Sequence, residues 1–101
     1  MIGEIIGAMS TEIRVFSVDE HPLVRQGLAM LIDSQPGMMM VAQASSGREA
    51  IGGFREHKPD VTLMDLSLPD MSGIDATIAI RREFPTARII ILTTFESERE
   101  F

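Results

Sequence analysis

The chain of 101 residues contains no cysteine. Disulfides and thiolate metal sites are therefore excluded, so a bound metal has to rely on oxygen ligands, while the compartment stays open. Basic residues are also few: nine Lys and Arg are scattered among fifteen Asp and Glu, for a net charge of −6. Nucleic-acid surfaces need clustered positive charge, so this chain by itself is not expected to bind DNA or RNA.

Long hydrophobic runs are missing as well. No apolar stretch approaches the length that a membrane-spanning helix requires. Residues 1–9 contain no basic residue and include Glu4, a composition that argues against a signal peptide. We therefore expect a cytoplasmic protein that does not interact with membranes. Residues 1–11 are interpreted as an N-terminal leader without an assigned function.

The length admits one domain at most, and the 45% hydrophobic composition argues against disorder. No internal repeat or low-complexity linker interrupts the chain. Four short apolar runs are predicted as strands and alternate with segments of helical spacing; the runs are 13–18, 38–42, 61–64 and 88–92. Short connections between alternating strands and helices predict an α/β fold, a doubly wound parallel sheet with helices on both faces. We expect the strand order 2-1-3-4.

Helix boundaries are marked by proline and by capping residues. Pro22 suits the first turn of the first helix. Ser46 stands three residues before Glu49, which is the spacing of a capping box at the start of the second helix. Ser72 is a candidate cap for the third helix. The glycine pair 52–53 lies inside the second helix, and each glycine is expected to weaken that helix by about 1 kcal/mol relative to alanine.

Oxygen-bearing side chains follow three of the predicted strands. Asp65 ends the third strand, Asp19 and Glu20 follow the first, and Thr93 follows the fourth. The carboxyl ends of parallel strands meet at one edge, and the crevice between the first and third strands is the switch point where ligands bind in such sheets. Taken alone, Asp65 also fits a turn cap and Thr93 an ordinary strand-end threonine.

Several carboxylates at one edge repel one another unless a cation lies among them. Asp19, Glu20 and Asp65 form an all-oxygen set that suits Mg²⁺, and the backbone carbonyl of Ser67 is a candidate additional ligand. With its charge screened by the metal, Asp65 is a candidate nucleophile toward phosphorus. Thr93 is placed to donate a hydrogen bond to a phosphoryl oxygen. His21 is interpreted only as a polar residue at a helix start.

Three segments together carry a resemblance to a known family. Residues 18–28 (VDEHPLVRQGL), 63–73 (LMDLSLPDMSG) and 91–95 (ILTTF) resemble the receiver domain of two-component response regulators. The Asp-Glu-His-Pro start and the Leu-Thr-Thr-Phe end are most similar to the NarL/FixJ (LuxR-type) subfamily. The resemblance covers residues 12–101 and implies a flavodoxin-like fold.

The resemblance also implies roles for individual residues. Asp65 matches the aspartate that accepts a phosphoryl group from a sensor histidine kinase. Asp19 and Glu20 match the acidic pair that binds Mg²⁺, with Glu20 as the expected direct ligand, and Ser67 matches the position whose carbonyl completes the metal shell. Thr93 matches the switch hydroxyl. Receivers of this subfamily usually precede a helix-turn-helix output domain, through which alone DNA would be bound.

One departure from the family is large. The family has a fifth strand with an essential lysine, and both would lie beyond Phe101; the single lysine, Lys58, does not match that position. We therefore expect residues 12–101 to form an incomplete receiver domain that lacks the fifth strand and the last helix. A fourth strand left at the edge exposes unpaired backbone groups, which predicts a homo-oligomer.

Two other functions compete with the phosphoryl-accepting switch. The first is a receiver-like interaction module that is not phosphorylated, which the absent lysine favours. The second is a phosphatase with an aspartate nucleophile. Such enzymes place a second acid two residues after the nucleophile, and Ser67 stands there in this chain, which argues against this function.

Overall fold

The computed structural model describes residues 12–93. Strands and helices alternate along this part of the chain, and their bounds are β1 Ile13–Val18, α2 Pro22–Asp33, β2 Met38–Ala44, α3 Gly47–His57, β3 Val61–Asp65, α4 Gly73–Glu83 and β4 Ile89–Leu92. Two predicted boundaries need correction, because β2 continues to Ala44 and β4 begins at Ile89. The leader 1–11 and the expected helix start at 96–100 lie outside the described residues.

The strands form a parallel sheet in the order β2-β1-β3-β4, as the alternation predicted. The register between β1 and β2 shifts between Val15 and Phe16, where β2 contains one extra residue. Beyond this shift the pairing continues to Val18 and Ala44, so β2 has one residue more than β1. On the other side, Asp65 pairs with Leu92 at the last position of β3.

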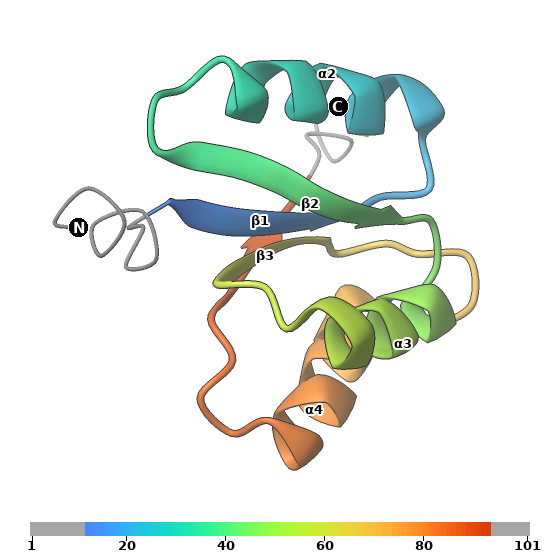
Figure 1. Cartoon of the computed structure of the whole chain (residues 1–101). Coiled ribbons are helices and arrows are strands. Elements are labelled where there is room, and N and C mark those ends of the chain that lie inside the picture. Colours follow the sequence, from blue (N-terminus) through green and yellow to red (C-terminus); the bar gives the residue numbers. More distant parts are fainter. Residues whose placement is uncertain (1–11, 94–101) are drawn as a thin grey trace, which may run out of the picture.

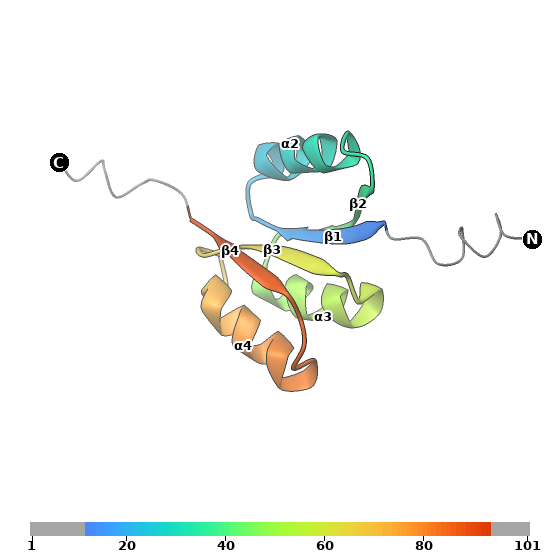
Figure 2. The same ribbon diagram turned by 90° about the vertical axis from the view of Figure 1, so that its left-hand side faces the viewer.

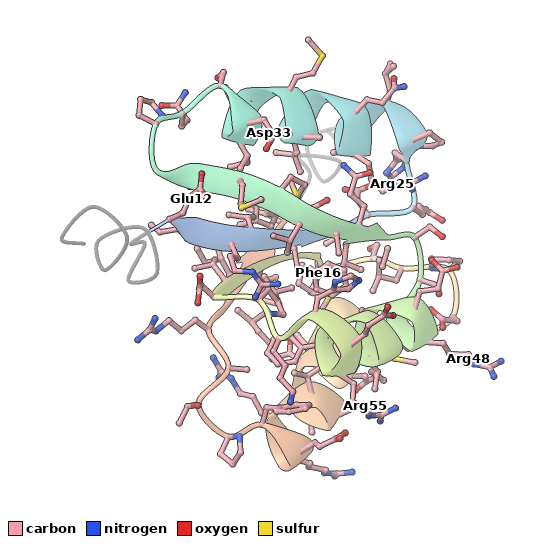
Figure 3. The ribbon with its side chains drawn as sticks, in the orientation of Figure 1. Glu12, Phe16, Arg25, Asp33, Arg48 and Arg55 are labelled. Carbon is pink, nitrogen blue, oxygen red and sulfur yellow. The ribbon has the colours of Figure 1, made fainter. Side chains whose placement is uncertain are left out.

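The helices cover the two faces of the sheet unequally (Figure 1). One face carries α2, which lies over β1 and β2, and the other carries α3 and α4 (Figure 2). The main core lies on the face of α3 and α4, where Phe16 extends from β1 toward α3 (Figure 3). Its buried members come from both the strands and the helices: Phe16, Val18, Ala44, Ala50, Phe54, Met64, Ala76 and Ile80.

The face of α2 is the less buried side of the domain. No residue of α2 is buried, and Leu23, Val24 and Leu31 are exposed. Ile90 and Leu92 on the edge strand β4 are exposed as well. Within residues 12–93, none of the helices has the length and apolarity needed to cross a membrane.

The helix starts follow the capping signals with one difference. Pro22 begins α2, and the hydroxyl of Ser72 accepts a hydrogen bond of 3.0 Å from the N–H of Asp75 at the start of α4. Ser46 accepts from the N–H of Glu49 at 3.2 Å. The Glu49 carboxylate does not return this bond to Ser46 but accepts from the N–H and hydroxyl of Ser45, both at 2.9 Å.

Replacing each of the two glycines inside α3 by alanine is expected to change the free energy of unfolding in opposite directions. A Cβ at Gly52 would meet no atom within 4 Å, so Gly52→Ala should raise the free energy of unfolding by about 1 kcal/mol. A Cβ at Gly53 would lie 2.8 Å from Cζ of the buried Phe16 ring, so Gly53→Ala should lower it by roughly 1 to 3 kcal/mol. Urea unfolding of both variants measures this difference, and equal stabilities would contradict it.

Candidate functional site

Two buried carboxylates meet at the carboxyl edge of the sheet. Asp65 is the last residue of β3 and is 4% exposed, whereas Asp19 directly follows β1 and is 7% exposed. β1 and β3 are neighbours in the sheet, so the fold brings these two strand ends together. Ligand atoms of Asp19, Asp65 and His21 all lie within 4.8 Å of one another. Asp19 and Asp65 therefore lie close together, as was predicted from their positions at the carboxyl ends of neighbouring parallel strands.

His21 lies at the start of α2, as predicted, but its contact with Asp19 was not foreseen from the sequence. Its backbone N–H donates to Oδ1 of Asp19 at 2.8 Å, and its Nδ1 lies 2.6 Å from the same oxygen. The hydrogen bond to the Asp19 carboxylate raises the pKa of His21. The signal that identifies it is the spacing Asp-x-His before the proline of α2, because a turn that caps a helix brings residues i and i+2 together.

The environment of Asp65 disfavours its charged form. Burial raises the pKa of the Asp65 carboxyl, and the neighbouring Asp19 carboxylate raises it further. The N–H of Ser67 donates to Oδ1 of Asp65 at 3.2 Å, which acts in the opposite direction. A cation placed between Asp65 and Asp19 would offset the cost of burying a charged Asp65 carboxylate. It would also offset the repulsion between the two carboxylates.

The remaining predicted residues lie near the cluster in different ways. Glu20 is exposed and is not among the three residues that converge; its Oε2 lies 3.9 Å from Nε2 of His21. Ser67 contacts Asp65 through its N–H. Thr93 is exposed and follows Leu92, the residue that pairs with Asp65, so it lies at the same edge.

Arg25 attaches the first turns of α2 to the site (Figure 3). Its Nη1 donates to the backbone carbonyl of Asp19 at 2.6 Å, while its own carbonyl accepts from the side-chain amide of Gln43 at 3.0 Å. The guanidinium thus bonds to backbone beside the carboxylates and leaves their oxygens available. This arrangement fixes where the segment after β1 turns into α2.

The donor set suits a hard divalent cation. Asp19 and Asp65 present carboxylate oxygens of like charge from two different strands, and no thiol exists in the chain to favour a softer metal. Burial and the neighbouring Asp19 carboxylate both raise the pKa of Asp65, so a bound cation would stabilise its ionised form. The chain therefore fits Mg²⁺, which needs few carboxylates and retains several waters.

A separate hollow lies at the other end of the sheet. It has a volume of about 300 Å³ and is lined by residues that precede β3 and β4 or end α3 and α4: Phe54, Lys58, Pro59, Asp60, Phe84, Thr86, Ala87 and Arg88. Lys58, the single lysine, lies there and its carbonyl accepts from Arg14. None of the residues that line the hollow belongs to the cluster of Asp19, His21 and Asp65. We therefore take the carboxylate cluster as the candidate functional site.

Comparison with known proteins agrees with this architecture. The family described as the response regulator receiver domain matches residues 15–101. The response regulator protein VraR of Staphylococcus aureus is 39% identical over 88 residues, which cover 87% of this chain and 42% of that protein. The chain thus spans less than half the length of this relative.

Solved structures give the same result. A LuxR-family two-component response regulator from Aurantimonas sp. superposes with a TM-score of 0.79 at 44% identity, covering 83% of this chain and 60% of that one. The response regulator domain of Thermotoga maritima CheB superposes with a TM-score of 0.77 at 41% identity, covering 80% and 60%. The chain therefore belongs to the response regulator receiver domain family, and its relatives include response regulators of the LuxR family.

Proposed function

We propose that this receiver domain accepts a phosphoryl group on Asp65, with Mg²⁺ bound by Asp19, Glu20, Asp65 and the carbonyl of Ser67. The observation that carries the proposal is the convergence of the buried Asp19 and Asp65 carboxylates at the switch point of the sheet. The domain acts as a switch, with phosphorylation and dephosphorylation occurring only on its own aspartate.

The residues have distinct tasks in the transfer from a phosphohistidine. An Asp65 carboxylate oxygen forms the new P–O bond, the P–N bond breaks, and the released imidazole takes up a proton. The Ser67 N–H holds Oδ1 of Asp65 and so orients the attacking group. The Thr93 hydroxyl donates to a phosphoryl oxygen. Bound Mg²⁺ supplies the positive charge that stabilises the phosphoryl oxygens and the acidic residues.

The proposed partners follow from the relatives. The donor is a sensor histidine kinase, and DNA is bound only through an output domain outside this chain. A structure of RcsB from Salmonella enterica, 28% identical to this chain, was solved on promoter DNA in the presence of the phosphomimetic BeF₃⁻. We infer the same type of coupling for a longer protein that contains this receiver.

Mg²⁺ titration followed by amide chemical shifts tests the proposal. Shifts should concentrate at Asp19, Asp65 and Ser67, and BeF₃⁻ added with Mg²⁺ should extend them to Thr93. Asp19→Asn should weaken Mg²⁺ binding strongly, because it removes one of two buried carboxylates. No binding up to millimolar Mg²⁺ would instead favour the interaction module without phosphorylation.

We also expect the chain to form a homo-oligomer. β4 is the edge strand of the described sheet, and Ile90 and Leu92 on it are 51% and 38% exposed. Association that pairs this edge or covers the apolar side chains of α2 buries nonpolar surface and satisfies backbone groups. Light scattering coupled to size exclusion at micromolar concentration should give a mass above that of one chain. A monodisperse monomer that unfolds cooperatively would contradict this expectation.

A further inference from the structure

A single carboxylate caps α3 from a distant part of the chain. Oδ1 of Asp70 accepts from the N–H of Gly47 at 2.8 Å, and Oδ2 accepts from the N–H of Arg48 at 3.0 Å. Ser46 accepts from the next N–H, that of Glu49. The first N–H groups of a helix lack partners within the helix. Asp70 therefore satisfies two of these donors from a position more than twenty residues later in the sequence.

Asp70 belongs to the loop 66–72, which leaves the site and leads to α4. The base of this loop is closed, because the N–H of Gly73 donates to the carbonyl of Leu66 at 2.7 Å and Ser67 forms a bridge with Ser72. Figure 1 shows the loop running past the N-terminal end of α3. The loop thus begins beside Asp65 and has its tip at the start of α3.

The tip makes an apolar contact as well as the polar one. Gly47 is buried beneath the side chain of Met71, and a Cβ at Gly47 would approach Met71 more closely than atoms can. Met71 is also in contact with the main core. Asp70 and Met71 therefore fasten the loop to α3 through neighbouring residues, and Asp70 supplies the hydrogen bonds of that attachment.

We propose that Asp70 is a positioning residue for the Asp65 site. By bonding to the start of α3 it holds the loop 66–72 so that Ser67 keeps its place against Asp65. Asp70 acts through Ser67 and touches neither metal nor substrate. The inference rests on the proposed function, since it assigns to Asp70 the task of aligning the Ser67 carbonyl that contributes to Mg²⁺ binding. Groups that orient metal ligands typically change metal affinity by about 10-fold to 100-fold.

The geometry explains why the position holds an aspartate. Each carboxylate oxygen accepts from a different backbone N–H, and a negative charge is favourable at a helix N-terminus. Asparagine of the same shape offers one acceptor and places its NH₂ group against the other N–H. Asp70→Asn should therefore weaken the attachment although the side chain is nearly isosteric.

The test compares Asp70→Ala with Ser46→Ala in the whole chain. Both variants remove a cap from α3, but only the first releases the loop. Amide exchange should rise at Gly47 and Arg48 in Asp70→Ala and at Glu49 in Ser46→Ala. Mg²⁺ titration by amide shifts should give a roughly tenfold weaker affinity for Asp70→Ala. The Mg²⁺ affinity of Ser46→Ala should stay within about twofold of that of the unchanged chain. The Mg²⁺ affinity of Asp70→Asn should fall as it does in Asp70→Ala.

Each outcome decides the question. Equal weakening in Asp70→Ala and Ser46→Ala would show that Mg²⁺ affinity follows the stability of α3, which overturns the positioning role. Unchanged affinity in Asp70→Ala overturns it as well. If the unchanged chain binds no Mg²⁺, the proposed function fails and the inference fails with it. Binding by the unchanged chain together with an unaffected Asp70→Ala refutes the inference alone.

Discussion

Asp65→Asn is expected to abolish phosphoryl uptake. The amide is nearly isosteric, so the 4% exposed side chain should keep its place at the end of β3, but it lacks the anionic oxygen that attacks phosphorus. Incubation with acetyl phosphate and Mg²⁺, followed by intact-mass spectrometry, should give a phosphorylated form for the unchanged chain and none for the variant.

Asp60→Asn is the matched control for this loss. Asp60 lies before β3, at the opposite end of the strand, where its Oδ2 accepts from the N–H of Arg14 at 2.8 Å. An asparagine oxygen can accept the same hydrogen bond, so the fold and the phosphoryl uptake should be retained. Uptake by Asp65→Asn with the stoichiometry of the unchanged chain would show that another residue is the nucleophile.

Gly73→Ala is expected to cause the largest loss of stability. Gly73 is buried at the start of α4, and a Cβ there would collide with the backbone carbonyl of Asp65 and meet Cγ of Met64 at 3.0 Å. The backbone at the end of β3 is held by sheet pairing and can yield only if Asp65 moves. We expect the free energy of unfolding to fall by about 3 kcal/mol, the upper part of the usual range for overpacking.

Gly27→Ala provides the control, because a Cβ at Gly27 in α2 would meet no atom within 4 Å. Alanine favours the helix interior, so this variant should gain about 1 kcal/mol. Urea unfolding measures both variants. Because the Gly73 collision is with Asp65 itself, Gly73→Ala should also weaken Mg²⁺ binding where Gly27→Ala does not. Similar stability of the two variants would contradict the argument.

The sequence by itself determined the parts of the molecule that depend on short-range patterns. Alternating apolar runs and helical segments predicted the doubly wound sheet and its strand order, which the structure confirms. The caps at Ser46 and Ser72 and the start at Pro22 were predicted because each depends on residues three or fewer positions apart. Asp65 and Asp19 were placed at one edge because parallel strands end together.

The tertiary structure alone decided which oxygens and nitrogens meet. Asp19, Asp65 and His21 converge while Glu20 stays outside their cluster, a result that depends on how the turn after β1 is built. The register shift that extends β2 likewise arises from pairing between separate strands.

The attachment of Asp70 to α3 is the clearest case. Its carboxylate and the N–H groups of Gly47 and Arg48 are brought together by the crossover through α3 and β3. Nothing in the local sequence of either segment specifies that contact, since helix caps are recognised from neighbouring residues. Local patterns fix which elements form, whereas contacts between elements depend on the packing of the whole domain, and that packing sets the geometry around Asp65.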